Sequence, residues 1–140
     1  MQAARNAFDH GGWPELSGKV RAGYLRRIAS LIRDRQQTPA ELEVRDNGKP
    51  LPEALWDIGD TAYGFDFYAD LSVQLDAQQE KAAALSDERL RSVARKEPAA
   101  AGGATLPWNF PILLPARAFA PALTARTTVD RPPHADPPSL

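Results

Sequence analysis

The chain has 140 residues, of which 43% are apolar and 25% are charged, a balance typical of a soluble globular protein with one domain around a buried core. Its 17 basic and 18 acidic residues nearly cancel, so no charge excess favours binding to nucleic acid or to an anionic membrane. The absence of cysteine excludes disulfides, thiolate zinc sites and thiol nucleophiles from these residues. The start has no signal-peptide core, and no apolar run reaches roughly 18 residues, so we expect a cytoplasmic protein without a membrane partner.

Helical periodicity begins early in the chain. Residues 3–8 have the character of the last turns of a helix that stops at Gly11 and Gly12, as if the chain began inside a structural unit. Ser17 then offers an N-cap for a second helix. Apolar residues at spacings of three and four predict its buried face, made of Val20, Tyr24, Leu25, Ile28, Leu31 and Ile32. The arginines are expected mostly off that face, at Arg21, Arg26, Arg27 and Arg33.

Two more helices are expected before the middle of the chain. Residues 38–41 (Thr-Pro-Ala-Glu) combine a capping box with proline at the first helical position, and this helix ends at Asn47 and Gly48. Another helix is predicted over residues 52–75, on a stripe of Leu55, Ile58, Ala62, Phe65, Ala69 and Ser72. Two interior glycines, Gly59 and Gly64, each cost up to ~1 kcal/mol relative to alanine, so packing must hold this helix.

The second half of the chain is less regular. Residues 76–88 are polar and predict a loop or a frayed helix end, whereas residues 89–96 alternate apolar and charged side chains as a half-exposed strand does. Most of the prolines lie after residue 106, and residues 130–140 show no apolar period. We therefore expect a disordered, proline-rich tail over residues 130–140.

Several short motifs, in order and at matching intervals, resemble the aldehyde dehydrogenase family, with betaine-aldehyde-type enzymes the most similar. The first is Asp-Asn-Gly-Lys-Pro at residues 46–50, followed by Glu53, Ala54 and Asp57. The second is Lys-Glu-Pro at residues 96–98, followed by Pro-Trp-Asn-Phe-Pro at residues 107–111. Ala-Pro-Ala-Leu at residues 120–123 matches the family's next helix. Any one of these motifs is weak evidence, but their shared order is strong evidence.

The resemblance implies an α/β fold over residues 1–129, namely the N-terminal helical part and first strand of a Rossmann-like NAD(P)-binding domain, incomplete and mostly helical. In such enzymes a cysteine attacks the aldehyde, hydride passes to the nicotinamide of NAD or NADP, and water releases the acid. Each donor that stabilises the oxyanion is worth roughly 2.7–4 kcal/mol. The resemblance implies that the carboxamide of Asn109 is such a catalytic donor, and that Leu106, Pro107 and Trp108 line the cofactor site.

Other interpretations of the same residues stay open. Asn109, between two aromatic residues, is also an ordinary turn residue, and packing of the loop alone also explains Trp108 and Phe110. Asp57 aligns with a family aspartate near a monovalent cation, but the other ligands of that cation come from segments outside residues 1–140. We therefore interpret Asp57 as a solvated helix residue and expect no metal site.

The sequence also departs from the family. Residues 99–105 (Ala-Ala-Ala-Gly-Gly-Ala-Thr) stand where relatives have a strand rich in glycine and valine, which weakens a buried strand. Ala118 and Pro132 stand where the family has lysines, the second of which contacts the cofactor ribose. We therefore expect that this chain alone does not bind NAD(P) measurably.

Two functional hypotheses follow. In the first, the chain is a truncated aldehyde dehydrogenase-like protein from a truncated or frameshifted gene. It is then inactive towards a small aldehyde by itself and associates with a separately encoded remainder of the enzyme. In the second, it is a small helical protein-interaction module that has kept the amphipathic helices between Val20 and Leu75 and has no catalytic activity. Dinucleotide binding separates the two, because the second hypothesis requires none.

Overall fold

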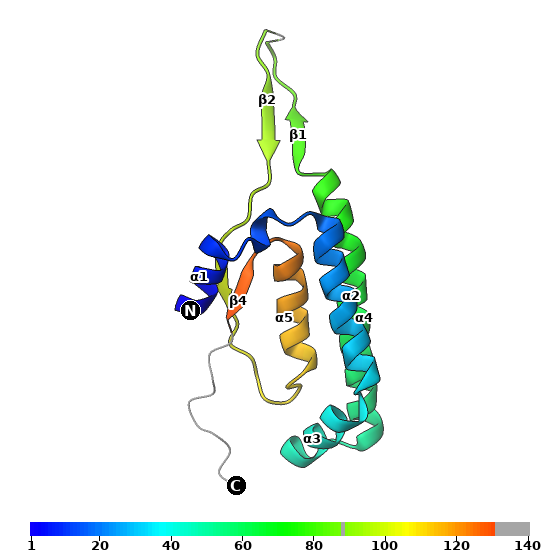
Figure 1. Ribbon diagram of the computed structural model, residues 1–140. Coiled ribbons are helices and arrows are strands. Elements are labelled where there is room, and N and C mark those ends of the chain that lie inside the picture. Colours follow the sequence, from blue (N-terminus) through cyan, green and yellow to red (C-terminus); the bar gives the residue numbers. More distant parts are fainter. Residues whose placement is uncertain (88, 131–140) are drawn as a thin grey trace.

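A computed structural model describes residues 1–87 and 89–130, most of which are helical. In chain order the elements are α1 (Gln2–His10), the 3₁₀ turn η1 (Trp13–Glu15), α2 (Gly18–Asp34), α3 (Gln37–Asn47), α4 (Leu51–Ala77), β1 (Glu80–Ala83), β2 (Ser92–Arg95), β3 (Ala101–Gly103), α5 (Leu113–Thr124) and β4 (Thr128–Asp130). Figure 1 shows α2 and α4 side by side along one flank, with α5 between this pair and β4. The predicted fold class, a mostly helical N-terminal part of an aldehyde dehydrogenase α/β fold, is confirmed.

The main core lies where α2, α4 and α5 meet, and small side chains allow these helices to approach closely. Its buried members are Ala22, Leu25, Ala29, Ala62, Phe65, Ala69, Ala116 and Ala120. A second cluster of Ala40, Ala54 and Ile58 joins α3 to α4. At the start of α2, Gly18 lies so close to the Ser72 carbonyl that any Cβ would collide with it. Most members of the stripe predicted for α4 are buried, so that prediction is confirmed.

The face predicted for α2 is wrong at its N-terminal end. The Ser17 hydroxyl does accept from the Val20 N–H at 3.4 Å, which confirms the cap, but Val20 and Tyr24 are exposed. The buried position is instead Arg21, which is only 1% exposed because its guanidinium pairs with Asp76 of α4 at 2.7 Å. A long-range ion pair therefore overrides the apolar pattern here.

The predicted start of α3 is also wrong, whereas its end is confirmed. The helix begins at Gln37 rather than after a Thr38 cap, because only Arg35 and Gln36 separate it from α2. It ends at Gly48, whose φ of 76° is the left-handed conformation that favours glycine.

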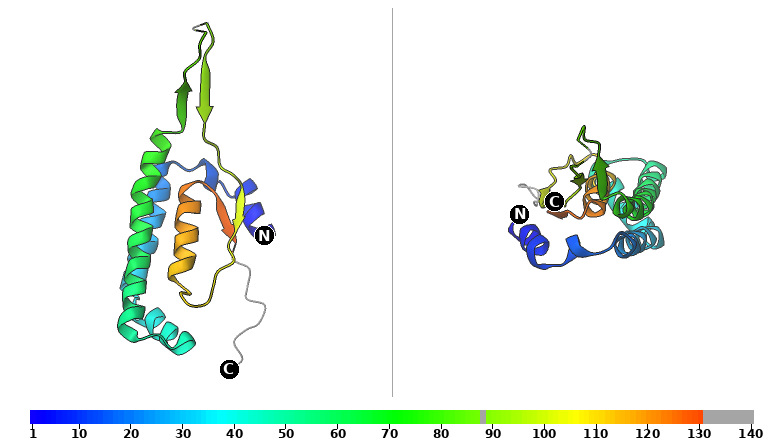
Figure 2. Two further views of the ribbon diagram at one scale, coloured as in Figure 1. Left: turned by 180° about the vertical axis from the view of Figure 1, so that it is seen from behind. Right: turned by 90° about the horizontal axis from the view of Figure 1, so that it is seen from above.

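Two short sheets complete the described part of the chain. β3 and β4 are parallel, with Ala101 opposite Thr128, and α5 connects them as a βαβ unit. The strand expected just before the Pro-Trp-Asn loop is therefore present despite its alanine and glycine content. β1 and β2 form an antiparallel hairpin that projects from the end of α4 (Figure 2). The loop predicted over residues 76–88 is therefore wrong in part.

Strand β4 includes one residue of the predicted tail. Asp130, assigned from the sequence to the tail, is the last residue of β4, and its carboxylate accepts a hydrogen bond from the amino group of Met1. Residues 131–140, including Pro132, lie outside the described residues. None of the described helices is both long and apolar enough to span a membrane.

Candidate functional site

The candidate site is the loop between β3 and α5, residues 104–112. It leaves the carboxyl end of β3 and enters the N-terminus of α5, which is where open α/β sheets place their ligands. Pro107, Trp108 and Asn109 are exposed, and Leu106 is half-buried. Trp108 is 69% exposed, so the interpretation of this side chain as a packing residue is wrong. The four predicted site residues thus lie together on one accessible loop.

The structure brings the two main motifs of the sequence into contact. The Asn47 side-chain amide donates to the Asn109 carbonyl at 3.4 Å, and its own Oδ1 accepts from the Lys49 N–H at 3.0 Å. The Lys49 ammonium lies 4.0 Å from the centroid of the Phe110 ring, within cation–π range. The helix junction at residues 46–50 therefore contacts the loop at residues 107–111 and restrains it.

Lys49 also forms a buried ion cluster, and this finding corrects the interpretation of Asp57. Its ammonium donates to Glu43 Oε1 at 2.6 Å and to Asp57 Oδ2. Asp57 is 4% exposed and Glu43 is 2% exposed, so neither carboxylate is solvated. Periodicity missed both because each is buried by a charged partner rather than by apolar packing. The only signal in the sequence was their proximity to a motif lysine.

The cluster favours the charged form of the lysine. Burial alone acts to lower the pKa of Lys49, but the hydrogen bonds to Asp57 and Glu43, together with their negative charges, raise that pKa above its ordinary value. The ammonium is therefore protonated at neutral pH, as the contact with the ring of Phe110 requires.

Open space adjoins this cluster and the loop. A cavity of about 490 Å³ is lined by Pro52, Glu53, Trp56, Asp57 and Phe110. Within the described part of the chain, no group of three His, Cys, Asp or Glu side chains is arranged to hold a metal ion. The arrangement offers an exposed carboxamide, an aromatic surface and a buried ion cluster beside an accessible space.

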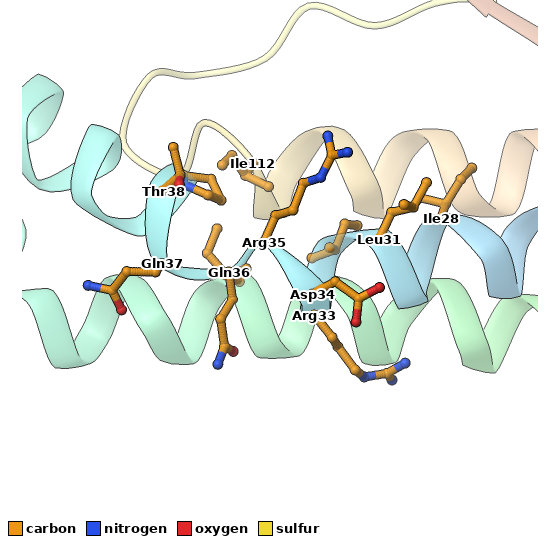
Figure 3. A pocket seen from close by; sticks show the side chains of 12 residues that line it. Ile28, Leu31, Arg33, Asp34, Arg35, Gln36, Gln37, Thr38 and Ile112 are labelled. Carbon is orange, nitrogen blue, oxygen red and sulfur yellow. The ribbon is translucent and has the colours of Figure 1, made fainter.

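A larger groove of about 820 Å³ lies elsewhere, at the turn between α2 and α3. Figure 3 shows Ile28 and Leu31 from α2, the turn residues Arg35 and Gln36, Gln37 at the start of α3, and Ile112 from the segment before α5 around it. The predicted site residues are not among those that line it. We therefore place the candidate site at the loop rather than in this groove.

Comparison with known proteins decides the family. The sequence model of the aldehyde dehydrogenase family matches residues 1–139. The chain belongs to the aldehyde dehydrogenase family. It is 44% identical to aminoaldehyde dehydrogenase 2 of Zea mays, over 94% of this chain and 27% of that protein. It is 43% identical to betaine aldehyde dehydrogenase 1 of Oryza sativa, over 91% of this chain and 26% of that protein.

Solved structures agree with this assignment. The betaine aldehyde dehydrogenase of Staphylococcus aureus in complex with NAD⁺ matches with a TM-score of 0.85 and 30% identity, over 93% of this chain and 25% of that one. An NAD-dependent aldehyde dehydrogenase of Sinorhizobium meliloti gives the same TM-score and identity. The chain thus spans about a quarter of the length of these relatives.

Proposed function

We propose that these residues supply the oxyanion-binding loop and the first βαβ unit of an NAD(P)-dependent aldehyde dehydrogenase, whose reaction converts an aldehyde to a carboxylic acid. The observation that carries the proposal is the exposed loop at the carboxyl end of β3, held in place by the motif junction at residues 46–50. Amino- or trimethylammonium-substituted aldehydes are the proposed substrate class, in line with the names of the plant relatives. A cytoplasmic location remains a proposal, to be tested by cell fractionation.

In this proposal Asn109 is a catalytic residue. Its exposed carboxamide carries two N–H donors, and the Asn47 amide holds its backbone carbonyl at 3.4 Å while the side chain points to accessible space in this proposal. A fixed donor stabilises negative charge that develops on the aldehyde oxygen, and it costs no reorganisation when the reaction occurs. Leu106, Pro107 and Trp108 precede this donor and offer backbone and ring surface to a dinucleotide.

The described residues fit only part of an NAD(P) site. The loop and the N-terminus of α5 are present, but a Rossmann crevice requires neighbouring strands, and the described parallel sheet has two. Ala118, at the position where the resemblance to the family implies a lysine, offers no charged donor. When bound, the nicotinamide serves as the hydride acceptor of the reaction. We propose that the 140-residue chain alone binds this cofactor too weakly to measure.

The first experiment uses the purified 140-residue chain. We expect no NAD- or NADP-dependent oxidation of an aminoaldehyde or of betaine aldehyde, because the chain has no cysteine to attack the carbonyl. Isothermal titration with millimolar NAD should show no saturable binding. Activity that survives removal of contaminating enzyme would overturn the proposed inactivity. Saturable binding that disappears in Trp108→Ala would overturn the proposed lack of cofactor affinity.

The second experiment tests the role of Asn109 in a complete enzyme. The matched segment of this chain replaces the corresponding segment of the maize aminoaldehyde dehydrogenase. We expect Asn109→Ala to lower kcat of this chimera about 10²- to 10³-fold. Asn6→Ala, at an exposed asparagine of α1, serves as the matched control and should leave kcat unchanged. Equal activity of the Asn109 variant and the control would refute the catalytic role.

A further inference from the structure

We propose that Lys49 is the positioning residue that fixes the Asn109 loop, acting through a three-way contact among the end of α3, the start of α4 and the ring of Phe110. This inference rests on the proposed function of Asn109. It goes further, because it assigns the geometry of the donor to a buried lysine that does not itself belong to the loop.

The Lys49 side chain is itself held rigidly. Its ammonium bonds to carboxylates from two different helices, Glu43 near the end of α3 and Asp57 in the second turn of α4. Two charged hydrogen bonds and burial restrict a side chain that is otherwise flexible. The position of Nζ is therefore fixed by the packing of α3 against α4.

Lys49 contacts the loop through both its side chain and its backbone. With Nζ held 4.0 Å from the centroid of the Phe110 ring, the cation attracts the face of the ring and limits the positions of residue 110. The preceding carbonyl, that of Asn109, is held at 3.4 Å by the Asn47 amide. That amide is oriented in turn by the Lys49 N–H. Backbone and side chain of Lys49 thus restrain two consecutive loop residues.

The exposed residues of the loop are not fixed by packing of their own side chains. Ile112, at the end of the loop, packs against Ala40, Ala54 and Ile58, but Trp108 and Asn109 are exposed and contribute no buried side chain of their own. A loop with few buried contacts samples several conformations unless specific bonds select one. The contacts to Asn47 and Lys49 are the selecting bonds, and an oxyanion donor acts only when it is preorganised.

The structural readout uses the 140-residue chain and does not depend on activity. Backbone ¹⁵N order parameters are measured at residues 108–110 in the wild type, Lys49→Met, Phe110→Leu and the control Lys19→Met, whose lysine is exposed on α2. We expect order parameters of about 0.85 in the wild type and the Lys19→Met control, and below about 0.6 in Lys49→Met and Phe110→Leu. Phe110→Leu keeps the ion cluster intact, so it tests the contact even if Lys49→Met fails to fold. Unchanged order parameters in a folded variant would overturn the proposal.

The kinetic readout uses the chimeric enzyme described above. Loss of positioning should lower kcat of Lys49→Met by roughly tenfold to a hundredfold with little change in KM, because a small misplacement of the donor affects the transition state most. Lys49→Arg, which retains a cation for both carboxylates and the ring, should recover part of kcat. A rise in KM alone, or no recovery by arginine, would contradict the positioning role. If the wild-type chimera is inactive, the proposed function fails, while the order parameters still decide the restraint by Lys49.

Discussion

The two ends of α4 carry ion clusters of opposite composition. Near its start, one cation, Lys49, lies between the carboxylates of Glu43 and Asp57. Near its end, one carboxylate, Asp76, lies between the guanidinium groups of Arg21 and Arg126, at 2.7 Å and 3.5 Å. The first cluster joins the consecutive helices α3 and α4, whereas the second joins residues that are 50 or more positions apart in the sequence.

The surroundings of the clusters separate their roles. The Lys49 cluster touches the exposed loop that carries Asn109, whereas the Asp76 cluster ties α2 and α4 to Arg126 just after α5, beside a cavity of about 330 Å³ that Lys96 and Glu97 also line. The Gly18 N–H and the Leu16 carbonyl are also bonded within the second cluster. Similar chemistry therefore stabilises the fold at one end of the helix and, by our proposal, positions a reactive loop at the other.

The largest expected effect on stability is at Lys49. Lys49→Met removes the cation and leaves two buried carboxylates without their partner, which should destabilise the chain by about 3–5 kcal/mol. Urea unfolding followed by circular dichroism measures this loss. Lys19→Met, at an exposed position, should change the unfolding free energy by less than about 0.5 kcal/mol. A loss in Lys49→Met no larger than in this control would mean that the cluster is solvated.

Arg21→Met should cost less, about 1.5–3 kcal/mol, although Arg21 is the more deeply buried cation. Asp76 keeps the Gly18 N–H and Arg126 after the substitution, and the methionine stem retains much of the apolar packing. Arg26→Met, whose exposed guanidinium pairs with Asp70 at 2.6 Å, is the matched control, with an expected cost below about 1 kcal/mol. Equal losses for the two variants would erase the distinction between buried and exposed arginines of α2.

Acid titration distinguishes the two clusters further. Burial acts to raise the pKa of Asp76, but the hydrogen bonds from Gly18 and Arg21 and the charges of both arginines outweigh it, so the pKa is lowered. A carboxyl with a depressed folded pKa stabilises the protein above its unfolded pKa, and this stability is lost as the pH falls through the folded value.

Asp76→Asn should therefore destabilise the chain by about 1 kcal/mol at neutral pH, because a charged acceptor becomes a neutral one. The difference from the wild type should shrink below pH 3.8, the ordinary value for this carboxyl, and vanish below its folded pKa. Unfolding free energies at several pH values measure this convergence. A constant difference at every pH would show that Asp76 does not titrate with folding.

Local signals in the sequence predicted much of the fold. Three of these signals depend only on neighbours a few residues away: Ser17 as a cap, Gly48 as a helix end and the buried stripe of α4. The sequence predicts them without knowledge of the tertiary structure. The strand before the loop was predicted through the family resemblance and is present as β3.

Tertiary pairing explains what the sequence did not show. Arg21 and Asp76 are 55 residues apart, and no periodicity connects them. Asp57 lies only eight residues from Lys49, but its burial depends on the packing of α3 against α4. The strand at Glu80–Ala83 forms because it pairs with β2, not because its own sequence alternates. For the candidate site, the family motif located the loop. The contacts of Asn47 and Lys49 with that loop depend on tertiary structure, so the sequence did not show them.

The smallest expected effect concerns two glycines near the Lys49 cluster. Gly59 lies on the exposed side of α4, where an added Cβ would meet no atom within 4 Å. Gly59→Ala should therefore stabilise the chain by about 0.5–1 kcal/mol, because alanine loses less backbone entropy in a helix. Gly48→Ala also has open space around the added Cβ, but its φ of 76° strains any residue with a side chain, so this variant should be destabilised instead. Thermal unfolding of the two variants, compared with the wild type, should give shifts of opposite sign. A stabilised Gly48→Ala would show that residue 48, at the end of α3, leaves its left-handed conformation in the variant. The restraint on Asn47 would then have to come from other contacts.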